Sequence, residues 1–289
     1  MSHLLQSISP MNFSDIQAID VHGRYGVYER AGNRLAQQFM SASLSEVVER
    51  AARQSIELTI VSPLSALLPR GGADVVAGNA EAFAQVRHEP RARHYVVIDP
   101  RVPATFAQAE QMLATPQCVG IKIHPEEHVY PVAQWGRPVF EFAARWGAVI
   151  LAHTSEANSL CADMVGWADE FPEIRLILAH IGHGGDGDYS HQVRGVQASR
   201  RGNVWADTSS ARSITPGLIE WAVREVGPER VLFGSDTPLY HCGMHRARIE
   251  LAEIPPAQRQ MILRDNALAL FGDRLGLPAA TPGSTPPVG

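Results

Sequence analysis

Five apolar stretches of the sequence end in, or close to, a side chain that can bind a metal ion or transfer a proton. The five side chains are His22, His124, His153, His180 and Asp236. A single histidine after an apolar stretch is usually a hydrogen-bonded structural residue, but five stretches with the same ending indicate a shared site. Neutral imidazoles and a carboxylate are the ligand types of catalytic zinc centres. The sequence therefore predicts one site of metal or acid–base chemistry.

The stretches that carry these residues are predicted to be strands of a barrel. Eight short runs rich in β-branched residues recur along the chain, at 16–22, 56–63, 94–100, 118–125, 148–154, 174–182, 203–209 and 230–238. Near-continuous apolar runs of this length are typical of parallel strands buried on both faces, and segments with helical spacing separate them. This alternation predicts a single-domain α/β fold, the (β/α)8 TIM barrel, whose sites form at the C-terminal ends of the strands. An open doubly wound sheet is the alternative, but no glycine-rich phosphate turn follows the first strand.

Composition excludes several classes of partner. The chain has 289 residues, a formal net charge of -5 and three cysteines, which argues against nucleic-acid binding and against a disulfide framework. No signal peptide or membrane-spanning run is evident, so we expect a soluble, cytoplasmic protein that acts on a small molecule and forms a homodimer. The predicted barrel covers 16–275, after an N-terminal extension at 1–15 and before a disordered Pro- and Gly-rich tail at 276–289.

Six motifs follow one another in the order of the predicted strands. They read DVHGR, VGIKIHP, LAHTSE, LILAHIGHGG, VWADTSS and VLFGSDTP, and the pattern closes with the helix MILRDNALALFG. The ordered set resembles the amidohydrolase superfamily, in particular the amidohydrolase-2 branch. That branch includes aminocarboxymuconate-semialdehyde decarboxylase and metal-dependent hydrolases. The resemblance runs from about residue 19 to residue 272, and it implies a TIM barrel with a metal-dependent active site.

The resemblance implies a role for individual residues. It makes His22 and His153 ligands of Zn2+ or another divalent ion. It places His180 beside the metal, where it polarises water or substrate and can complete the ligand set. It makes Asp236 a ligand or proton-transfer group, so that Asp236 and His180 are the predicted catalytic residues. Lys122 matches a strand on which binuclear members carry a bridging carbamylated lysine; the alternative is a lysine neutralised by a carboxylate of the barrel.

The sequence departs from the family pattern at Arg24, which stands where the family has a second histidine two residues after the first. Arginine cannot bind a cation, so three interpretations stay open. In the first, His22, His153, Asp236 and His180 hold the metal while Arg24 binds an anionic substrate. In the second, the metal is lost and the guanidinium of Arg24 replaces its charge. In the third, Arg24 points away from the site and forms a structural ion pair with Asp20 or Glu29.

Further side chains near the strand ends are candidates for binding the substrate. We expect this group to contain Arg24, Lys122, His124, Glu156, His183 and Tyr240, while Asp207 and Ser209 brace their neighbours through hydrogen bonds. The predicted function is hydrolysis of a C–N or C–O bond in a small, carboxylate-bearing molecule by activated water. Non-oxidative decarboxylation is the alternative within the family, and a barrel that binds a ligand without catalysis is the alternative outside it.

Overall fold

Eight parallel strands form one sheet in the order of the chain, in a computed structural model that describes residues 13–278. The strands are β1 (Ala18–Tyr25), β2 (Ile56–Pro63), β3 (Ala92–Val97), β4 (Cys118–Ile123), β5 (Val149–Ala152), β6 (Arg175–Leu178), β7 (Val204–Asp207) and β8 (Val231–Leu232). The first strand closes on the segment that begins with β8, because Val21 N–H donates to the Phe233 carbonyl at 2.9 Å and Asp236 N–H donates to the His22 carbonyl at 2.7 Å. The predicted barrel is therefore confirmed.

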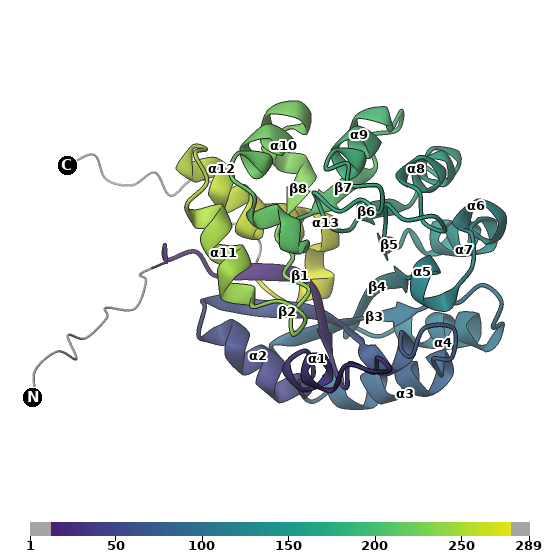
Figure 1. Cartoon of the computed structure of the whole chain (residues 1–289). Helices are drawn as coiled ribbons and strands as arrows, with labels where there is room; N and C mark the ends of the chain where they lie inside the picture. The colour runs from purple at the N-terminus through teal and green to yellow at the C-terminus, as the bar shows by residue number, and fades with distance from the viewer. Residues whose placement is uncertain (1–12, 279–289) are drawn as a thin grey trace, which may run out of the picture.

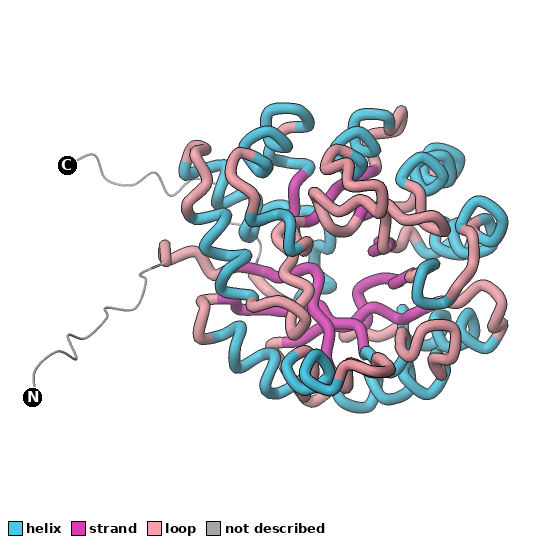
Figure 2. The backbone as a smooth tube through the Cα atoms, viewed as in Figure 1, coloured by secondary structure: helices cyan, strands magenta, loops and turns pink. Residues whose placement is uncertain are grey.

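Helices surround the strands on the outside of the barrel (Figures 1 and 2). They are α1 (Arg34–Phe39), α2 (Leu44–Ala52), α3 (Val75–Val86), α4 (Ala104–Leu113), α5 (Pro125–His128), α6 (Val132–Trp135), α7 (Arg137–Trp146), α8 (Cys161–Glu170), α9 (His191–Ala198), α10 (Leu218–Val226), α11 (Cys242–Glu250), α12 (Pro256–Gln260) and α13 (Asn266–Phe271). No helix between residues 13 and 278 combines the length and the apolar character needed to cross a bilayer.

Two apolar layers leave only one end of the barrel free for a site. In the outer layer, strand residues such as Ile121, Ile150 and Leu176 pack against the surrounding helices. The inner layer joins the starts of the strands to α13, whose Leu268 and Phe271 lie in the same cluster as Leu58 and Ile60 of β2. Because α13 covers the N-terminal ends of the strands, the polar residues gather at the C-terminal ends, as TIM barrels require.

The structure differs from the sequence-based expectation at several element ends. β1 continues to Tyr25, so that Arg24 lies inside this strand rather than after it, and His22 lies three residues before its end. β8 ends at Leu232, four residues before Asp236. The alternation predicted for β4 is confirmed, since Ile121 packs in the outer layer while Lys122 contacts His22 inside the barrel. The proposed extension (1–15) and tail (276–289) lie largely outside the described residues.

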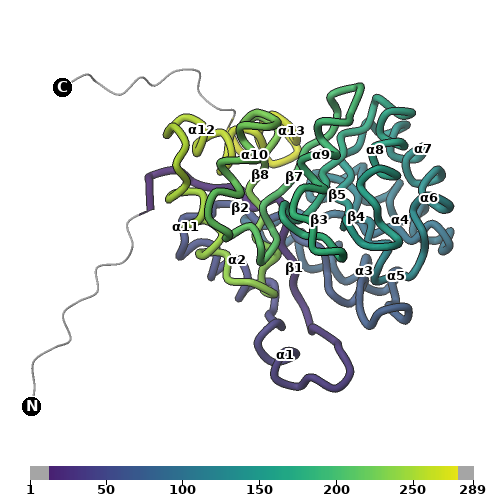
Figure 3. The backbone as a smooth tube through the Cα atoms, turned by 45° about the horizontal axis from the view of Figure 1, so that its top comes forward, coloured from purple at the N-terminus to yellow at the C-terminus, as the bar shows by residue number. Residues whose placement is uncertain are grey.

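The segment between β1 and α2 leaves the barrel and carries the short helix α1. Figure 3 shows this segment projecting beyond the strand ends. No residue of α1 is buried, and Leu35 and Phe39 are 64% and 69% exposed. Tyr28 and Arg30, at the start of the segment, nevertheless return to the mouth of the barrel, where they line its cavity.

We predict that Gly120→Ala destabilises the barrel. A Cβ at Gly120 would lie 2.5 Å from the Val149 carbonyl oxygen of the neighbouring strand and 3.2 Å from the Tyr95 ring. Such overpacking typically costs about 1–3 kcal/mol, so the urea midpoint and the melting temperature should fall. Gly166→Ala in α8 is the matched control, because a Cβ there meets nothing within 4 Å and alanine favours a helix. Equal stability of the two variants would contradict this account of β4.

Candidate active site

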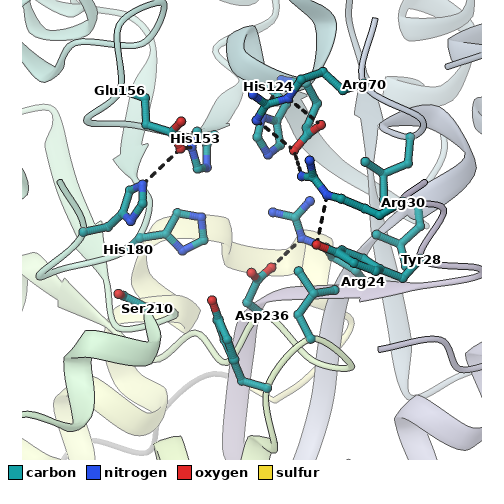
Figure 4. Close-up of a pocket in the computed structure, with 16 residues that line it drawn as sticks. Arg24, Tyr28, Arg30, Arg70, His124, His153, Glu156, His180, Ser210 and Asp236 are labelled. Atoms are coloured by element: carbon teal, nitrogen blue, oxygen red, sulfur yellow. Dashed lines mark hydrogen bonds and ion pairs between the residues drawn. The ribbon is translucent and has the colours of Figure 1, made fainter. Parts of the chain in front are cut away.

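A cavity of about 180 Å3 opens at the C-terminal ends of the strands. Figure 4 shows His153 and His180 on one side of it, Arg24 and Arg30 on the opposite side, and Asp236 between them at the base. The full lining is Arg24, Tyr28, Arg30, Leu64, Leu68, Arg70, His124, Glu127, His153, Glu156, His180, His183, Ser210, Asp236, Leu239 and Tyr240. Charged and imidazole side chains thus dominate a pocket with a few apolar and aromatic walls, a lining suited to a small acid.

Asp207, the last residue of β7, organises the floor of the site. Its Oδ2 accepts a hydrogen bond from His22 Nδ1 at 2.9 Å. Its Oδ1 accepts from the His180 backbone N–H at 2.9 Å and from the Ser209 hydroxyl. Because that hydroxyl donates to Asp207, it can only accept from His180 Nδ1 at 2.7 Å. His180 therefore carries its proton on Nδ1 and presents the lone pair of Nε2, and the predicted bracing roles of Asp207 and Ser209 are confirmed.

Arg24 pairs with Asp236 in the base of the cavity. The Arg24 Nε donates to Asp236 Oδ1, and both side chains are 5% exposed. The expected partners of Arg24, Asp20 and Glu29, are therefore wrong. Asp20 instead accepts hydrogen bonds from Ser235, from the backbone N–H at 3.1 Å and from the hydroxyl at 2.5 Å.

Asp236 and His180 reach the cavity through unusual backbone. Asp236 has a φ of 55° and His180 a φ of 76°, in the left-handed region. Residues other than glycine pay a cost of roughly 1–3 kcal/mol there. The hydrogen bonds from the two backbone N–H groups to His22 and Asp207 hold these conformations. Strain of this kind concentrates at functional sites, where it fixes the direction of a reactive side chain.

Lys122 lies beneath the cavity and does not line it. Its Nζ is 3.2 Å from His22 Nε2, and the side chain is completely buried. Burial lowers the pKa of Lys122 well below its usual value, and the charge of Arg24 lowers it further. Lys122 therefore has no direct access to a substrate in the cavity, and its predicted role in substrate binding is not supported. The other predicted substrate-binding residues all line the cavity: Arg24, His124, Glu156, His183 and Tyr240.

Burial sets the protonation of the other polar groups. It lowers the pKa of His22, His124 and His180 well below the usual value, and it lowers that of His153 to about 4. These rings are neutral near pH 7. Burial also raises the pKa of Asp236 while Arg24 opposes the rise, so that this carboxyl can exchange a proton closer to neutral pH than a free aspartate.

His124, His153 and Glu156 form a second group of polar side chains on the wall of the cavity. The rings of His124 and His153 stack with centroids 4.1 Å apart. His153 Nε2 lies 2.8 Å from Glu156 Oε1, and His183 Nε2 lies 3.1 Å from the same oxygen. These two contacts hold Glu156 as a carboxylate, and they lower its pKa.

Sequence reasoning missed a charged cluster at the mouth of the cavity. Glu127 accepts from Arg30, and it pairs with Arg70 through Nε at 3.2 Å. The glutamate is buried, whereas the two arginine side chains are 37% and 45% exposed. No motif marks these arginines, because they lie on loops after β1 and β2 that only the fold brings together.

Two clusters of ligand-type side chains occur within residues 13–278. One is the buried group of His22, His180 and Asp207, and the other is His153, Glu156 and His183. Neither contains the full predicted set of His22, His153, His180 and Asp236. The four ligand atoms do not converge in this arrangement, because His153 turns Nε2 to Glu156 and Asp236 binds Arg24. Their assignment as ligands stays a prediction that metal analysis must test.

Similar folds occur among solved structures. A 5-carboxyvanillate decarboxylase from Sphingomonas paucimobilis has a TM-score of 0.69 at 17% identity, over 89% of this chain and 99% of that one. A 5-carboxyvanillate decarboxylase from Novosphingobium aromaticivorans, complexed with manganese and a nitrobenzoic acid, has a TM-score of 0.67 at 14% identity, over 88% and 95%. A Pseudomonas putida protein with a suggested 2-pyrone-4,6-dicarboxylic acid hydrolase activity has a TM-score of 0.64 at 20% identity, over 91% and 99%.

At these identities the likeness concerns the fold, and the family follows from the sequence. A family model described as amidohydrolase matches residues 70–272, from the loop after β2 to the end of α13. The matched residues include the ends of β4 to β8 and therefore His124, His153, His180, Asp207 and Asp236. The chain belongs to the amidohydrolase family, in the amidohydrolase-2 branch that its strand-end motifs resemble.

Proposed function

We propose that this chain is a non-oxidative decarboxylase of a small, single-ring carboxylic acid. One observation carries the proposal: the guanidinium of Arg24 and the buried carboxyl of Asp236 meet at the base of one cavity. A guanidinium grips a carboxylate, and a buried acid beside it is placed to supply the proton that must replace CO2. Several of the similar folds belong to decarboxylases of aromatic acids, which supports this choice over hydrolysis.

The size and the walls of the cavity suit one ring. An engineered protein cavity of about 150 Å3 binds benzene, and the cavity here measures about 180 Å3. Leu64, Leu68 and Leu239 supply apolar wall, while Tyr28 and Tyr240 add aromatic surface. A planar ring can therefore pack against these side chains while its carboxylate points to Arg24.

The reaction follows from the placement of charge. A substrate carboxylate at Arg24 is a second anion beside Asp236, and two neighbouring carboxylates favour retention of one proton between them. The C–C bond to the carboxylate then breaks, its electron pair stays on the ring carbon, and CO2 leaves. Asp236 transfers its proton to that carbon, so that the acid R–COO⁻ plus one proton becomes R–H plus CO2. Solvent reprotonates Asp236 after release.

The mouth of the cavity supports a substrate with a second carboxylate. Arg30 and Arg70 share the single carboxylate of Glu127 as their ion-pair partner, while the charges of Glu126 and Glu156 act on Arg70 from farther away. Arg24, by contrast, is matched by Asp236. A diacid places one carboxylate at each end of the cavity and satisfies both positions. This argument extends the sequence-based expectation of an anionic substrate to a dianionic one.

Hydrolysis is the second candidate, and one observation favours it. His180 is neutral and presents the lone pair of Nε2, because its Nδ1 donates to Ser209. A neutral imidazole in this orientation can remove a proton from water as it attacks an ester or lactone carbonyl. Asp236 would then protonate the leaving oxygen, and Arg24 would hold a carboxylate of the substrate.

We predict that isotopes separate the two reactions. With single-ring mono- and diacids in D2O, decarboxylation places one deuterium on the carbon that lost CO2 and leaves no oxygen label from H2(18)O in the product. Mass spectrometry of the product and a CO2 assay measure both. One oxygen atom from solvent in the product, without release of CO2, would instead establish hydrolysis.

We predict that Asp236→Asn lowers kcat by about 10²–10⁴, the usual contribution of a positioned general acid. The amide keeps the shape of the side chain and its contact with Arg24, but it cannot act as a general acid. Stopped assays of CO2 release and a melting curve check this. Activity within twofold of the wild type, in a variant that remains folded, would exclude Asp236 as the proton donor.

We predict that Arg70→Ala raises KM for a diacid by about 10- to 100-fold, the size of one lost charge-assisted hydrogen bond, with little change in kcat. KM for the matching monoacid should change far less. Arg137→Ala is the matched control, because Arg137 forms an exposed ion pair with Glu170 outside the cavity and exposed pairs contribute little. An equal effect on both acids would argue against a second carboxylate site.

A further inference from the structure

We propose that Arg24 and Lys122 occupy the position of the catalytic metal ion, and that this enzyme works without a divalent cation. The inference concerns the site of the proposed function and rests on it for the catalytic step, but metal binding can be tested independently. It selects the second of the interpretations of Arg24, in which a fixed positive charge replaces that of an ion.

The first support is the occupation of Asp236. The Arg24 Nε donates to Asp236 Oδ1, which is also the oxygen that faces His22 Nε2 at 3.4 Å. Ligand atoms at about 2.1 Å from a tetrahedral ion are spaced about 3.4 Å apart, so His22 and Asp236 keep the spacing of a ligand pair. The guanidinium nevertheless already binds the oxygen that the ion would need.

The second support is the occupation of His22. Its Nδ1 is bound to Asp207, which directs the Nε2 lone pair into the barrel, as carboxylates do for histidines that bind metals. The nearest group to that lone pair is Lys122 Nζ at 3.2 Å. The amine donates a hydrogen bond where an ion would accept the lone pair, so both members of the spaced pair face a nitrogen of the chain itself.

The third support is that the two ligand-type clusters are closed by hydrogen bonds of their own. In the group of His22, His180 and Asp207, the Ser209 hydroxyl lies 3.0 Å from His22 Nδ1 and 2.7 Å from His180 Nδ1, and it donates to Asp207. A protein hydroxyl therefore fills the point that the three ligand atoms share.

The outer cluster is closed in the same way, because His153 and His183 both contact one oxygen of Glu156. Both rings donate a hydrogen bond to that oxygen, so their Nε2 atoms carry protons and have no lone pair to offer to an ion.

Charge completes the argument. The groups buried at the centre of the barrel include two basic side chains, Arg24 and Lys122, and three acidic ones, Asp20, Asp207 and Asp236. Asp20 is bound to Ser235 and burial raises its pKa to about 7, whereas the permanent charge of Arg24 lies directly against Asp236. A divalent ion would add two positive charges beside that guanidinium, in a place where burial makes unpaired charge costly. A histidine at position 24 would remove this fixed charge, so that a divalent ion could bind between the ligand atoms. Arg24 is therefore the residue that determines whether this site binds a divalent ion.

The experiment compares the metal content of wild type, Arg24→His and Arg145→His. Each protein is purified without chelator and analysed for Mn, Fe, Co, Ni, Cu and Zn, and Mn2+ and Zn2+ are then titrated calorimetrically into EDTA-treated, desalted protein. Arg145 lies on the exposed face of α7, so its variant controls for the added imidazole. Melting curves before and after EDTA treatment show whether each protein is folded.

We expect the wild type and Arg145→His to contain less than 0.1 ion per chain, with melting temperature and activity unaffected by EDTA. Arg24→His should approach one ion per chain and bind Mn2+ or Zn2+ at least tenfold more tightly than the wild type. A wild type with close to one ion per chain would overturn the inference, even if Arg24→His failed to fold. A folded Arg24→His variant that binds no ion would also overturn it. A metal-free wild type that releases no CO2 from any acid would refute the proposed function and leave the inference standing.

Discussion

The carboxylate of Asp207 accepts hydrogen bonds from three separate parts of the barrel, and the geometry of the whole site follows from them. It fixes the ring of His22 from β1, the backbone of His180 beyond β6 and the hydroxyl of Ser209 beyond β7. The bonds from His22 and Ser209 determine which ring nitrogen of His22 and of His180 carries a proton. The free lone pair of His22 therefore faces Lys122, and that of His180 is left for the cavity. A buried carboxylate is costly unless its oxygens accept hydrogen bonds, and the bonds that satisfy Asp207 also order its neighbours.

The closure of the barrel places the reactive pair at its base. After β8 the chain does not continue as a strand but turns through Asp236, whose backbone donates to the carbonyl of His22. That hydrogen bond brings the carboxyl of Asp236 to Arg24 across the junction of the first and last strands. This contact helps to close the cylinder and also assembles the ion pair, so the stability of the fold and the position of the acid are linked.

The sequence predicted the parts of this site that sit on regular elements. The strand-end histidines and the alternation that turns Lys122 inward follow from periodicities that the sequence displays directly, and the bracing role of Asp207 was expected from its place at the end of a predicted strand. Contacts made by loops could not be predicted in this way. Arg30, Arg70 and Glu127 come from three separate connections, and the partner of Arg24 depends on a turn in left-handed backbone, for which Asp236 gives no local signal.

The ion cluster at the mouth makes Glu127 a tethered rival of every incoming anion. It is always present beside Arg30 and Arg70 at the effective concentration of a group attached to the same molecule. Chloride or a simple carboxylate from solution has to compete with this internal carboxylate. An acid already anchored at Arg24 competes from within the cavity on equal terms. If the substrate is the proposed diacid, this entrance therefore favours molecules that bind at both ends of the cavity, because the internal carboxylate of Glu127 competes with any anion that binds at the mouth alone.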